Sequence, residues 1–477
     1  MKKYEKYKST GIEWMGEIPA HWPVNKVARA FLNIGSGTTP EAGLDKYYLN
    51  GTINWVNTGD LNDGILHHCQ KKVTEQALKE FSTLKVYPAG TVLVAMYGAT
   101  IAKTSLLQFD ACTNQACCAL TVGPTLLEKF AFYWFIANKS HLISLGYGGG
   151  QPNISQDTIR QLRIQTPPID EQQSITTYLD HKTGELDKLL AEKQALLGLL
   201  QKKREATINE AVTQGLDAKV PRKHSGVDWL GDVPAHWEVK QLKHLTTKIG
   251  SGVTPLGGAE VYQDEGVPLL RSQNIYSDGL RLDDVAFITE EVHASMRNSQ
   301  VEHGDVLLNI TGASIGRCYF YEGETGRANV NQHVCIIRPN DKVTKEFLHL
   351  ALASTLGQFQ VDLSQNGASR EGLTFSQLKN FRIPTPSVAE QREILAVVDG
   401  QLQKIGEASH LIKTQLDTLK AYRQALISEV VTGKVDVRGE VPTPATASKA
   451  KAPATKQKSS AKSGEDRKGQ LGLFGLS

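Results

Sequence analysis

The sequence of 477 residues predicts an α+β protein in which two tandem mixed α/β domains are each followed by a long α-helix. Two observations support this fold class. Two stretches of about 45 residues, at 171–215 and 390–433, have the composition and apolar spacing of long helices. In addition, the motifs that precede each stretch occur twice in the same order, which indicates a pseudo-twofold internal repeat.

The first helical stretch begins after Pro167 and Pro168, which end the segment before it. It consists mostly of good helix formers, and at about 1.5 Å per residue it predicts a rod of roughly 65–70 Å. Its apolar residues recur at near-heptad spacing while the other faces are charged, so the helix needs a partner helix along its length. These apolar residues are Leu179, Leu186, Leu190, Leu197, Leu200 and Ile208.

The second helical stretch supplies that partner. Its apolar residues fall seven apart without a gap at Val398, Ile405, Ile412, Leu419 and Leu426. The two stretches align without gaps at a separation of 219 residues, so that Glu171 matches Glu390 and Arg204 matches Arg423. We therefore expect the two helices to form a coiled coil.

The globular segments are duplicated as well. The phrase GIEWMGEIPAHW begins at Gly11 and returns at Gly226 as GVDWLGDVPAHW. The run GTVLVAMYGATIAK after Ala89 returns as GDVLLNITGASIGR after His303. Each globular part has about 150 residues, a usual size for one domain.

Each globular part is predicted to contain both strands and helices. Short apolar, β-rich runs at 91–98, 117–122, 305–312 and 334–339 predict buried strands. Two further runs, at 130–140 and 347–355, predict short helices. The repeat then divides the chain into a first domain at 1–168, a first long helix at 169–217, a second domain at 218–386, a second long helix at 387–436, and a tail at 437–477.

Composition excludes some classes of protein. The chain has 53 Lys and Arg against 50 Asp and Glu, a formal net charge of +3, so any basic surface must come from the arrangement of charges. Its six Cys form no CxxC pair, so we expect buried thiols and no metal site. No signal peptide is recognisable, and the longest apolar run, near 130–137, is too short to span a membrane.

Catalytic motifs are absent from the sequence. It contains no P-loop and no DEAD-type box, so no nucleotide motor is visible. The nearest approach to an amino-methyltransferase motif, Thr166-Pro167-Pro168-Ile169, lacks the required first residue and the aromatic residue. We therefore expect no catalytic residues, and the sequence favours binding over catalysis.

The repeated motifs resemble those of one known family. GIEWMGEIPAHW with its copy, NITGASIGR, and the linkers TPPIDEQQSI and TPSVAEQREI that lead into the long helices resemble the specificity subunit of type I restriction-modification systems. The resemblance covers residues 1 to about 436. Any one of these motifs is weakly specific, whereas their twofold recurrence in the same order is strongly specific.

The resemblance implies a non-catalytic subunit of a type I site-specific DNA methyltransferase and endonuclease complex. Each domain would be a target-recognition domain that reads one half of a split site in double-stranded DNA. The helices would pack antiparallel, separate the domains by a fixed distance, and dock two modification (methyltransferase) subunits, which restriction (motor-nuclease) subunits then join. This chain would bind no cofactor itself; its partners would use S-adenosylmethionine, and ATP with Mg²⁺. Such a complex is cytoplasmic and DNA-associated, in a bacterium or an archaeon.

Candidate DNA-contacting residues are polar side chains in the predicted loops, because Arg, Lys, Asn and Gln usually read bases while Ser and Thr bind phosphates. In the first domain they are Asn57, Thr58, Tyr97, Lys103, Gln151 and Asn153. In the second domain they are Arg271, Gln273, Asn274, Thr311, Ser314, Arg317 and Arg370. The alternative for each is a solvated loop residue or a turn-forming polar group.

Some polar residues recur in both halves. Asn114-Gln115 returns as Asn331-Gln332. Positions shared by two domains with different targets are better explained by structure or phosphate binding than by base reading. By the same logic, Arg204 and Arg423 are candidates for contact with a partner subunit or with the other helix.

The tail carries a separate motif. Gln470, Leu471, Leu473 and Phe474 belong to QLGLF, which resembles the pentapeptide that binds the bacterial sliding clamp. It lies at the end of a basic segment of Ala, Lys, Pro, Ser and Thr that we expect to be disordered, and such a tether suits a docking motif. The alternative is that these apolar residues fold back onto the helices.

Two other hypotheses stay open. The chain could be a self-contained DNA-modifying enzyme with an unrecognised site, which the missing methyltransferase and nuclease motifs argue against. It could also be a coiled-coil scaffold without sequence selectivity, which leaves two large and divergent loop-rich domains unexplained.

Overall fold

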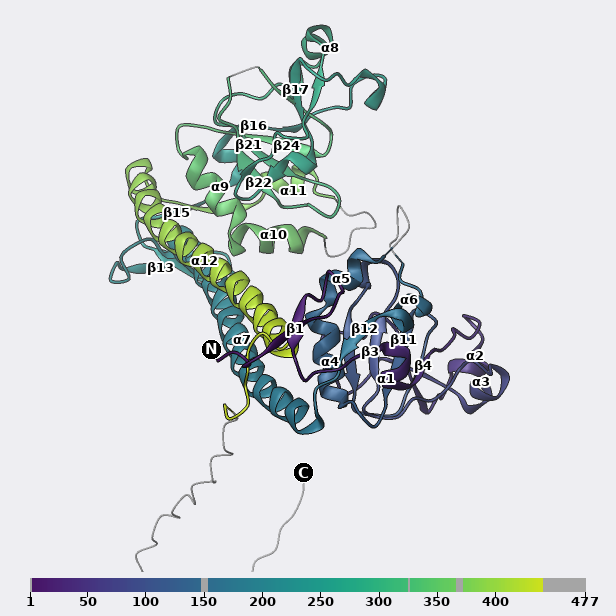
Figure 1. The fold of residues 1–477 in the computed structure, drawn as a ribbon. Helices are drawn as coiled ribbons and strands as arrows, with labels where there is room; N and C mark the ends of the chain where they lie inside the picture. The colour runs from purple at the N-terminus through teal and green to yellow at the C-terminus, as the bar shows by residue number, and fades with distance from the viewer. Residues whose placement is uncertain (1, 147–152, 325–326, 366–371, 441–477) are drawn as a thin grey trace, which may run out of the picture. The chain divides into compact units, whose positions relative to one another are not determined.

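The computed structural model describes residues 2–146, 153–324, 327–365 and 372–440 (Figure 1). It divides into two compact units. The first comprises Met1–Gly184 and the chain from Gln424 onward, and the second comprises Glu185–Arg423. Each unit therefore combines one globular domain with parts of both long helices.

The first domain is built on two sheets. One has five strands in the order β4-β11-β8-β9-β6, and the other has three in the order β10-β5-β7. The strands are β1 Tyr7–Ser9, β2 Glu17–Pro19, β3 Val24–Lys26, β4 Phe31–Ser36, β5 Ile53–Val56, β6 Ile65–Leu66, β7 Lys71–Val73, β8 Val92–Ala95, β9 Thr104–Leu107, β10 Cys112–Thr113, β11 Cys117–Val122 and β12 Arg163–Gln165. The helices are α1 Val27–Ala30, α2 Asp45–Tyr48, α3 Glu75–Glu80, η1 Gly98–Thr100, α4 Glu128–Ala137, α5 Lys139–Ser144 and α6 Gln156–Gln161.

The second domain repeats this arrangement. Its sheets have the orders β16-β24-β21-β22 and β20-β17-β23, which correspond to β4-β11-β8-β9 and β7-β5-β10. The strands are β13 Arg222–His224, β14 Asp232–Pro234, β15 Glu238–Gln241, β16 Thr246–Ser251, β17 Val267–Leu270, β18 Ile275–Tyr276, β19 Gly279–Leu280, β20 Ala286–Ile288, β21 Val306–Asn309, β22 Cys318–Phe320, β23 Asn329–Val330, β24 Val334–Pro339 and β25 Arg382–Thr385. The helices are η2 Leu242–His244, η3 Gly258–Val261, η4 Ser272–Asn274, α8 Glu290–Ser295, η5 Arg297–Ser299, α9 Lys345–Ala353, α10 Thr355–Gln365 and α11 Phe375–Lys379.

The predicted buried strands are confirmed as the central strands β8, β11, β21 and β24. Each contains four consecutive buried residues. A strand has buried residues on both faces only where the sheet is covered on both sides. The predicted short helices are α4, which packs on β8, β9 and β11, and α9, which packs on β21 and β22.

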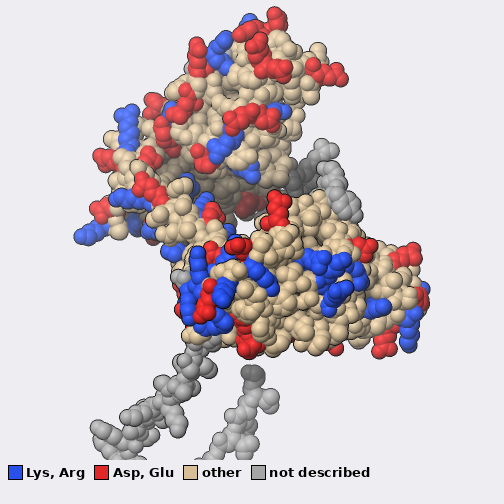
Figure 2. Space-filling view, viewed as in Figure 1, with Lys and Arg blue, Asp and Glu red and all other residues tan. Residues whose placement is uncertain are grey.

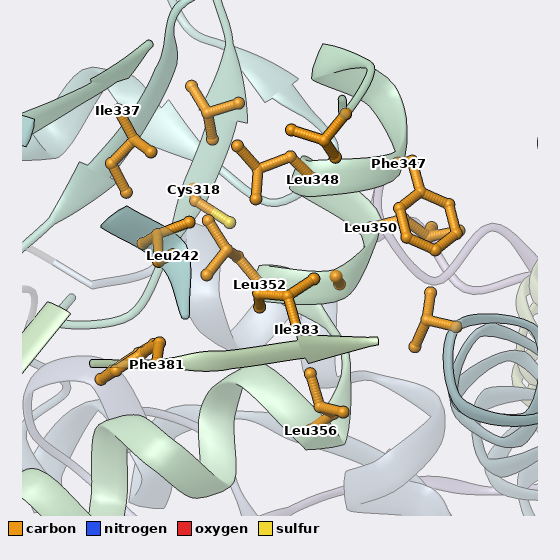
Figure 3. Packing of buried hydrophobic residues seen from close by; sticks show 14 of the residues in the cluster. Leu242, Cys318, Ile337, Phe347, Leu348, Leu350, Leu352, Leu356, Phe381 and Ile383 are labelled. Atoms are coloured by element: carbon orange, nitrogen blue, oxygen red, sulfur yellow. The ribbon is translucent and has the colours of Figure 1, made fainter. Parts of the chain in front are cut away.

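The core of the second unit joins its domain to both long helices. Phe347, Leu348 and Leu352 of α9 pack with Phe381 and with Ile383 of β25 (Figure 3). The same cluster includes residues of the two long helices, namely Ile208, Ala211, Val212, Ile394 and Val398. The domain and the helices of this unit therefore share one continuous hydrophobic core, which fixes the domain on the helix pair.

The two long helices are α7 Ile169–Gln214, of 46 residues, and α12 Val388–Val431, of 44 residues. Within the second unit they run antiparallel. Asp187, early in the α7 sequence, forms an ion pair with Arg423 near the end of α12. Ile208, near the end of α7, instead shares a core with residues near the start of α12. The predicted fold class, two mixed α/β domains with paired long helices, is thus confirmed.

A carboxylate at the start of each long helix anchors the domain; it is buried in Glu171 and half-buried in Glu390. Glu171 is 4% exposed, and its Oε2 accepts hydrogen bonds from His21 Nε2 at 2.8 Å and from Trp22 Nε1 at 3.1 Å. Glu390 accepts a hydrogen bond from Trp237 Nε1 at 2.9 Å and also contacts His236. The repeated His-Trp pair thus packs against the base of a helix and donates to a carboxylate oxygen that would be costly to leave unpaired there.

The chain enters and leaves each domain through paired strands. In the first domain β3 pairs antiparallel with β12, with Asn25 opposite Ile164. In the second domain β15 pairs antiparallel with β25, with Val239 opposite Pro384. Each domain is therefore closed at its base by a two-stranded ladder next to the helix that follows it.

All six cysteines are free thiols, and five are buried. Burial raises the pKa of Cys112, Cys118, Cys318 and Cys335 to about 12, so these groups stay protonated at neutral pH. Cys69 is only partly buried. No helix in the described part of the chain combines the length and the apolar character needed to cross a bilayer.

A histidine with a buried Nε2 atom packs against two aromatic rings in the second domain. His349 of α9 lies 5.0 Å from the Tyr319 ring and 5.5 Å from the Phe320 ring, centroid to centroid. Burial, with a smaller contribution from the Arg204 charge, lowers the pKa of His349 to about 4. His349 is therefore neutral in the folded protein at neutral pH.

We expect Trp237→Phe to lower the free energy of unfolding by about 1–3 kcal/mol, because Glu390 would lose a donor inside the interface. Trp229→Phe, in the same motif but 37% exposed, is the matched control and should change it by less than about 0.5 kcal/mol. Urea unfolding followed by circular dichroism checks this. Equal losses in the two variants would contradict the anchoring role.

The neutral His349 predicts a pH dependence of stability. In the unfolded chain this group takes up a proton below about pH 6.5, whereas in the folded protein it does so only near pH 4. Stability is therefore lost as the pH falls from 6.5 towards 4, by up to about 3 kcal/mol. Comparing urea unfolding of the wild type and His349→Gln at pH 7.5 and pH 5 isolates this contribution. A parallel loss in both proteins would contradict it.

Candidate nucleic-acid interface

In the first domain the candidate residues follow the ends of neighbouring strands. Asn57 and Thr58 come directly after β5, Tyr97 follows β8, and Asn153 forms a bridge to Tyr97. Backbone hydrogen bonds tie these ends together: Asn114 N donates to Val56 O at 3.1 Å, Met96 N to Ala116 O at 2.8 Å, and Ile154 N to Met96 O at 2.9 Å. The fold therefore brings segments distant in sequence into one frame.

The second domain builds the same frame from the matching residues. Asn331 N donates to Leu270 O at 3.2 Å, Ile310 N to His333 O at 3.0 Å, and Leu373 N to Ile310 O at 2.8 Å. Thr311 forms a bridge to Gly372, as Tyr97 does to Asn153. The positions of Asn57, Tyr97 and Asn153 thus have structural counterparts in the second domain.

The side chains at these counterpart positions differ in chemistry. Arg271 follows β17 where Asn57 follows β5, and Thr311 occupies the position of Tyr97. Arg317 precedes β22 as Lys103 precedes β9. The frame is therefore shared, while most of the groups that it presents are different. This combination suits two domains that contact different DNA sequences.

Arg271 is held at the start of η4. Its guanidinium lies over the Tyr262 ring, 5.6 Å from the centroid, and one of its terminal nitrogens donates to Asp284 O at 3.1 Å. Gln273 is exposed and donates to Asp284 Oδ2 at 2.8 Å. Asn274 is only 1% exposed, and its side chain bonds to Arg271 N and Arg281 O. Asn274 therefore shapes the loop that carries the other two residues.

Asn309 links the two loops of this surface. It is fully buried, and its Nδ2 donates to Ser272 O at 2.8 Å and to Ser314 Oγ at 3.1 Å. Thr311 Oγ1 lies 2.6 Å from His333 Nδ1. The structure therefore places Thr311 and Ser314 beside the Arg271 loop, in one region of the domain.

Arg317 lies at the border of this region. Its guanidinium lies over the Tyr276 ring, 5.1 Å from the centroid, and that of Arg281 lies at the same distance from this ring. Tyr276 is 37% exposed. Stacking on an aromatic ring holds an arginine without neutralising its charge.

In the first domain the candidates are placed as follows. Tyr97 is 40% exposed, and Lys103 is half-buried. The backbone N–H of Asn57 donates to Asp60 Oδ2 at 2.9 Å, which fixes the turn after β5. Asn153 has a buried side-chain oxygen without a hydrogen-bond partner among the described residues. Gln151 lies outside the residues that the structure describes, as does Arg370 in the second domain.

The amides that recur in both domains hold the frame. Asn114 Oδ1 accepts from Ala116 N at 3.2 Å, and Asn331 Oδ1 accepts from His333 N at 3.1 Å. The following glutamines also match, because Gln115 accepts from Thr39 and Gln332 from Thr254. These contacts agree with the interpretation that shared positions are structural.

The two recurring arginines of the long helices have different surroundings. Arg423 Nε contacts Asp187 Oδ1 of the other helix at 2.8 Å, so it forms a contact between the helices. Arg204 instead lines a pocket together with Arg317. The remaining partner-binding candidates, Gln470, Leu471, Leu473 and Phe474, lie outside the described residues.

Several residues of this region were not among the candidates predicted from the sequence. Tyr262 and Tyr276 support arginines, His333 contacts Thr311, and Asn309 joins two loops. Asn309 stands in the NITGAS motif, but the repeat has Ala95 at the matching position, so duplication gave no signal for it. Within the described ranges, no three His, Cys, Asp or Glu side chains lie close enough together to hold a metal ion.

Comparison with known proteins places this architecture in a family. Residues 29–197 and 234–420 match the model of the type I restriction modification DNA specificity domain. The MjaIX specificity subunit of Methanocaldococcus jannaschii is 23% identical over 439 residues, covering 90% of this chain and 96% of the relative. The EcoKI specificity subunit of Escherichia coli K12 is 20% identical over 451 residues, covering 90% and 92%.

A solved structure shows the same fold. A chain from a study of complex assembly and conformational transition of the type I R-M system matches with a TM-score of 0.68 at 16% identity, covering 88% of this chain and 99% of that one. With two matched domains, this chain belongs to the family of type I restriction-modification DNA specificity domains. It is the DNA specificity subunit of such a system, which is a non-catalytic member of the restriction enzyme complex.

Proposed function

We propose that this chain directs a methyltransferase and nuclease complex to a split DNA sequence, each domain reading one half. The observation that carries the proposal is the shared hydrogen-bonded frame with different side chains at matching positions. Because the two domains present different groups, the two half-sites should differ in sequence. The pseudo-twofold repeat suits half-sites on the order of one DNA turn apart.

Roles in DNA binding follow from the geometry of each candidate. The half-buried Arg271 and the exposed Gln273 lie on one loop that could reach base edges in the major groove. Asn57 and Asn153 could do so in the other domain. The neighbouring candidates suit contacts with the phosphate backbone as well as with bases. They are Thr58, Tyr97 and Lys103 in the first domain and Thr311, Ser314 and Arg317 in the second. Gln151 and Arg370 remain candidates on the sequence alone.

The long helices would set the distance between the domains and dock two modification subunits. Several large apolar side chains of these helices are exposed, including Leu196 at 42%, Leu199 at 61%, Leu411 at 58% and Tyr422 at 49%. Exposed apolar side chains on a helix favour packing against another chain. Because the helices are repeated, two copies of one partner could dock in equivalent ways.

The catalytic chemistry would belong to the partners. The modification subunits would use S-adenosylmethionine, and the restriction subunits would use ATP with Mg²⁺, in a cytoplasmic, DNA-associated complex. In functional terms the chain would divide into target-recognition domains at 1–168 and 218–386, spacer helices at 169–217 and 387–436, and a tail at 437–477.

A methylated-base map of host DNA, made by long-read sequencing with and without this gene, tests the proposal. We expect a split motif with two unlike halves that disappears when the gene is deleted. Co-expression with the modification subunit in a host that lacks both genes guards against silent partner genes. Absence of a new split motif in that host would contradict the proposal.

Arg271→Ala should weaken recognition of one half-site only, because an arginine that reads a base contributes about 1–3 kcal/mol, or roughly 5- to 150-fold in affinity. Asn57→Ala, at the matching position of the first domain, should affect the other half-site and serves as the paired control. The methylation maps of the two variants provide the measurement. Loss of specificity in the same half-site in both variants would contradict the assignment of one half to each domain.

We further propose that the C-terminal QLGLF segment recruits the complex to the sliding clamp, which would bring methylation to newly replicated DNA. We expect Leu473→Ala with Phe474→Ala to abolish capture of the full-length protein on immobilised clamp, since the motif would lose its two apolar anchors. Gly472→Ala, at the variable position of the motif, is the control. Undiminished capture of the double variant would end this idea.

A further inference from the structure

A polar pocket of about 610 Å³ lies in the second unit, between the two long helices and the β18–β19 hairpin. The hairpin contributes Tyr276, Ser277 and Asp278, and Arg317 lies beside them. The helices contribute the other lining residues, which are Leu200, Gln201, Arg204, Ile405, Gly406, Ser409, His410 and Lys413. The pocket therefore joins the DNA-specificity domain to the helix pair.

The charge of this pocket is unbalanced. Arg204, Arg317 and Lys413 line it, and within the described ranges no carboxylate lies at ion-pair distance from any of the three. Its one acidic residue, Asp278, already accepts two hydrogen bonds from Arg281, at 3.0 and 2.9 Å. Three cationic side chains around one cavity repel each other, and a bound anion would offset this repulsion.

The internal repeat shows which partner Arg204 lacks. Arg423 is the repeat counterpart of Arg204, and it pairs with Asp187 of the other helix. The counterpart of Asp187, 219 residues later, is Gly406, which lines the pocket with Arg204. Arg423 and Asp187 thus form an ion pair, whereas the equivalent residues Arg204 and Gly406 cannot, because glycine has no carboxylate.

Gly406 also leaves room for a ligand. A Cβ atom placed on it would meet no atom within 4 Å, so the space in front of this glycine is open. The glycine therefore does two things at once: it removes the acid that would neutralise Arg204, and it lets a ligand approach the helix backbone closely.

The pocket is continuous with the candidate DNA surface. Arg317 N donates to Ser314 O at 3.1 Å, and Asn309 N donates to Arg317 O at 2.8 Å. The loop that carries Thr311 and Ser314 therefore ends at the pocket. A DNA backbone lying on this surface would pass the three cations.

We propose that this pocket binds a phosphodiester of the DNA backbone beside the half-site that the second domain reads. This inference rests on the proposed function. Arg204 and Arg317 offer forked N–H donors that fit phosphate oxygens, and Lys413 adds a point charge. Ser277 also lines the cavity, and its hydroxyl group is a neutral donor for such a group. The Ser409 hydroxyl instead donates to Ile405 O of its own helix at 2.7 Å. The contact anchors DNA without reading its sequence.

Arg204→Ala in the complex of this chain with its modification subunits should weaken binding of a duplex carrying the split site by about threefold to tenfold. The loss should be similar for a non-target duplex, and the slope of log K against log salt should fall by about one, because one phosphate contact is removed. Fluorescence anisotropy at several salt concentrations measures both quantities.

Gly406→Asp is the sharper variant, because it restores the acid that the repeat has at Asp187. The new carboxylate should pair with Arg204 and close the pocket, so DNA affinity should fall as in Arg204→Ala while the free energy of unfolding does not. Gly400→Asp is the matched control. It adds the same charge to the same helix, where a Cβ also meets no atom within 4 Å, but outside the pocket. It should leave DNA affinity unchanged.

Neutral methylphosphonate linkages, introduced one at a time along the duplex, identify the ligand. We expect at least one position beside the second half-site where the substitution weakens binding by the wild type but causes no further loss with Gly406→Asp. Inorganic phosphate serves as the probe for a free anion. Competition by phosphate at millimolar concentration, with no linkage coupled to Gly406, would overturn the proposal.

The outcomes also separate this inference from the proposed function. If the wild-type complex binds no split site, the proposed function fails. If it binds the site and both Arg204→Ala and Gly406→Asp bind equally well, only the phosphate pocket is refuted. If the variants lose modification subunits while DNA affinity per assembled complex is unchanged, the pocket instead receives an acidic side chain of the partner, and the proposal is overturned.

Discussion

The structure depends on a hydrogen-bonded carboxylate at the start of each long helix, which is buried in Glu171 and half-buried in Glu390. Glu171 and Glu390 receive hydrogen bonds from the Trp and His that end each repeated N-terminal motif. A buried charge tolerates few alternatives to its donors, because leaving it unpaired costs several kcal/mol. This requirement fixes the orientation of each domain on its helix. The orientation of the surfaces that the domain presents follows from it.

Within each domain, backbone hydrogen bonds hold the strand ends together, so most of the side chains there are not needed for this purpose. The frame of strand ends is held by N–H and C=O groups in both domains, together with the recurring amides Asn114 and Asn331. Backbone groups make these contacts whatever the side chain, so the residues displayed on the frame can change without loss of the fold. On the face shown in Figure 2, both units present acidic and basic side chains.

The sequence predicted the fold class well because its strongest signals are periodic and repeated. Heptad spacing revealed both long helices, and strands β8 and β21 were visible as apolar runs. The candidate site was harder to predict. The duplication showed that Arg204 and Arg423 are equivalent positions, yet their surroundings differ. Arg423 pairs with Asp187, whereas Arg204 lies near Gly406, which has no acidic group. The sequence did not reveal this difference, because only the folded helix pair brings these residues together. Asn274 resembled a base reader in sequence, but it is buried and bonds within its own loop.

The strand ladders at the base of each domain, β3 with β12 and β15 with β25, have a consequence for how such a chain can vary. The chain enters and leaves each domain at neighbouring points. The rest of the domain is therefore, in topology, one long insertion next to a helix. The extra strand β6, which extends the main sheet of the first domain to five strands against four in the second, illustrates this freedom. Insertions and deletions inside a domain change what it displays, whereas the length and pairing of the helices are set elsewhere in the chain.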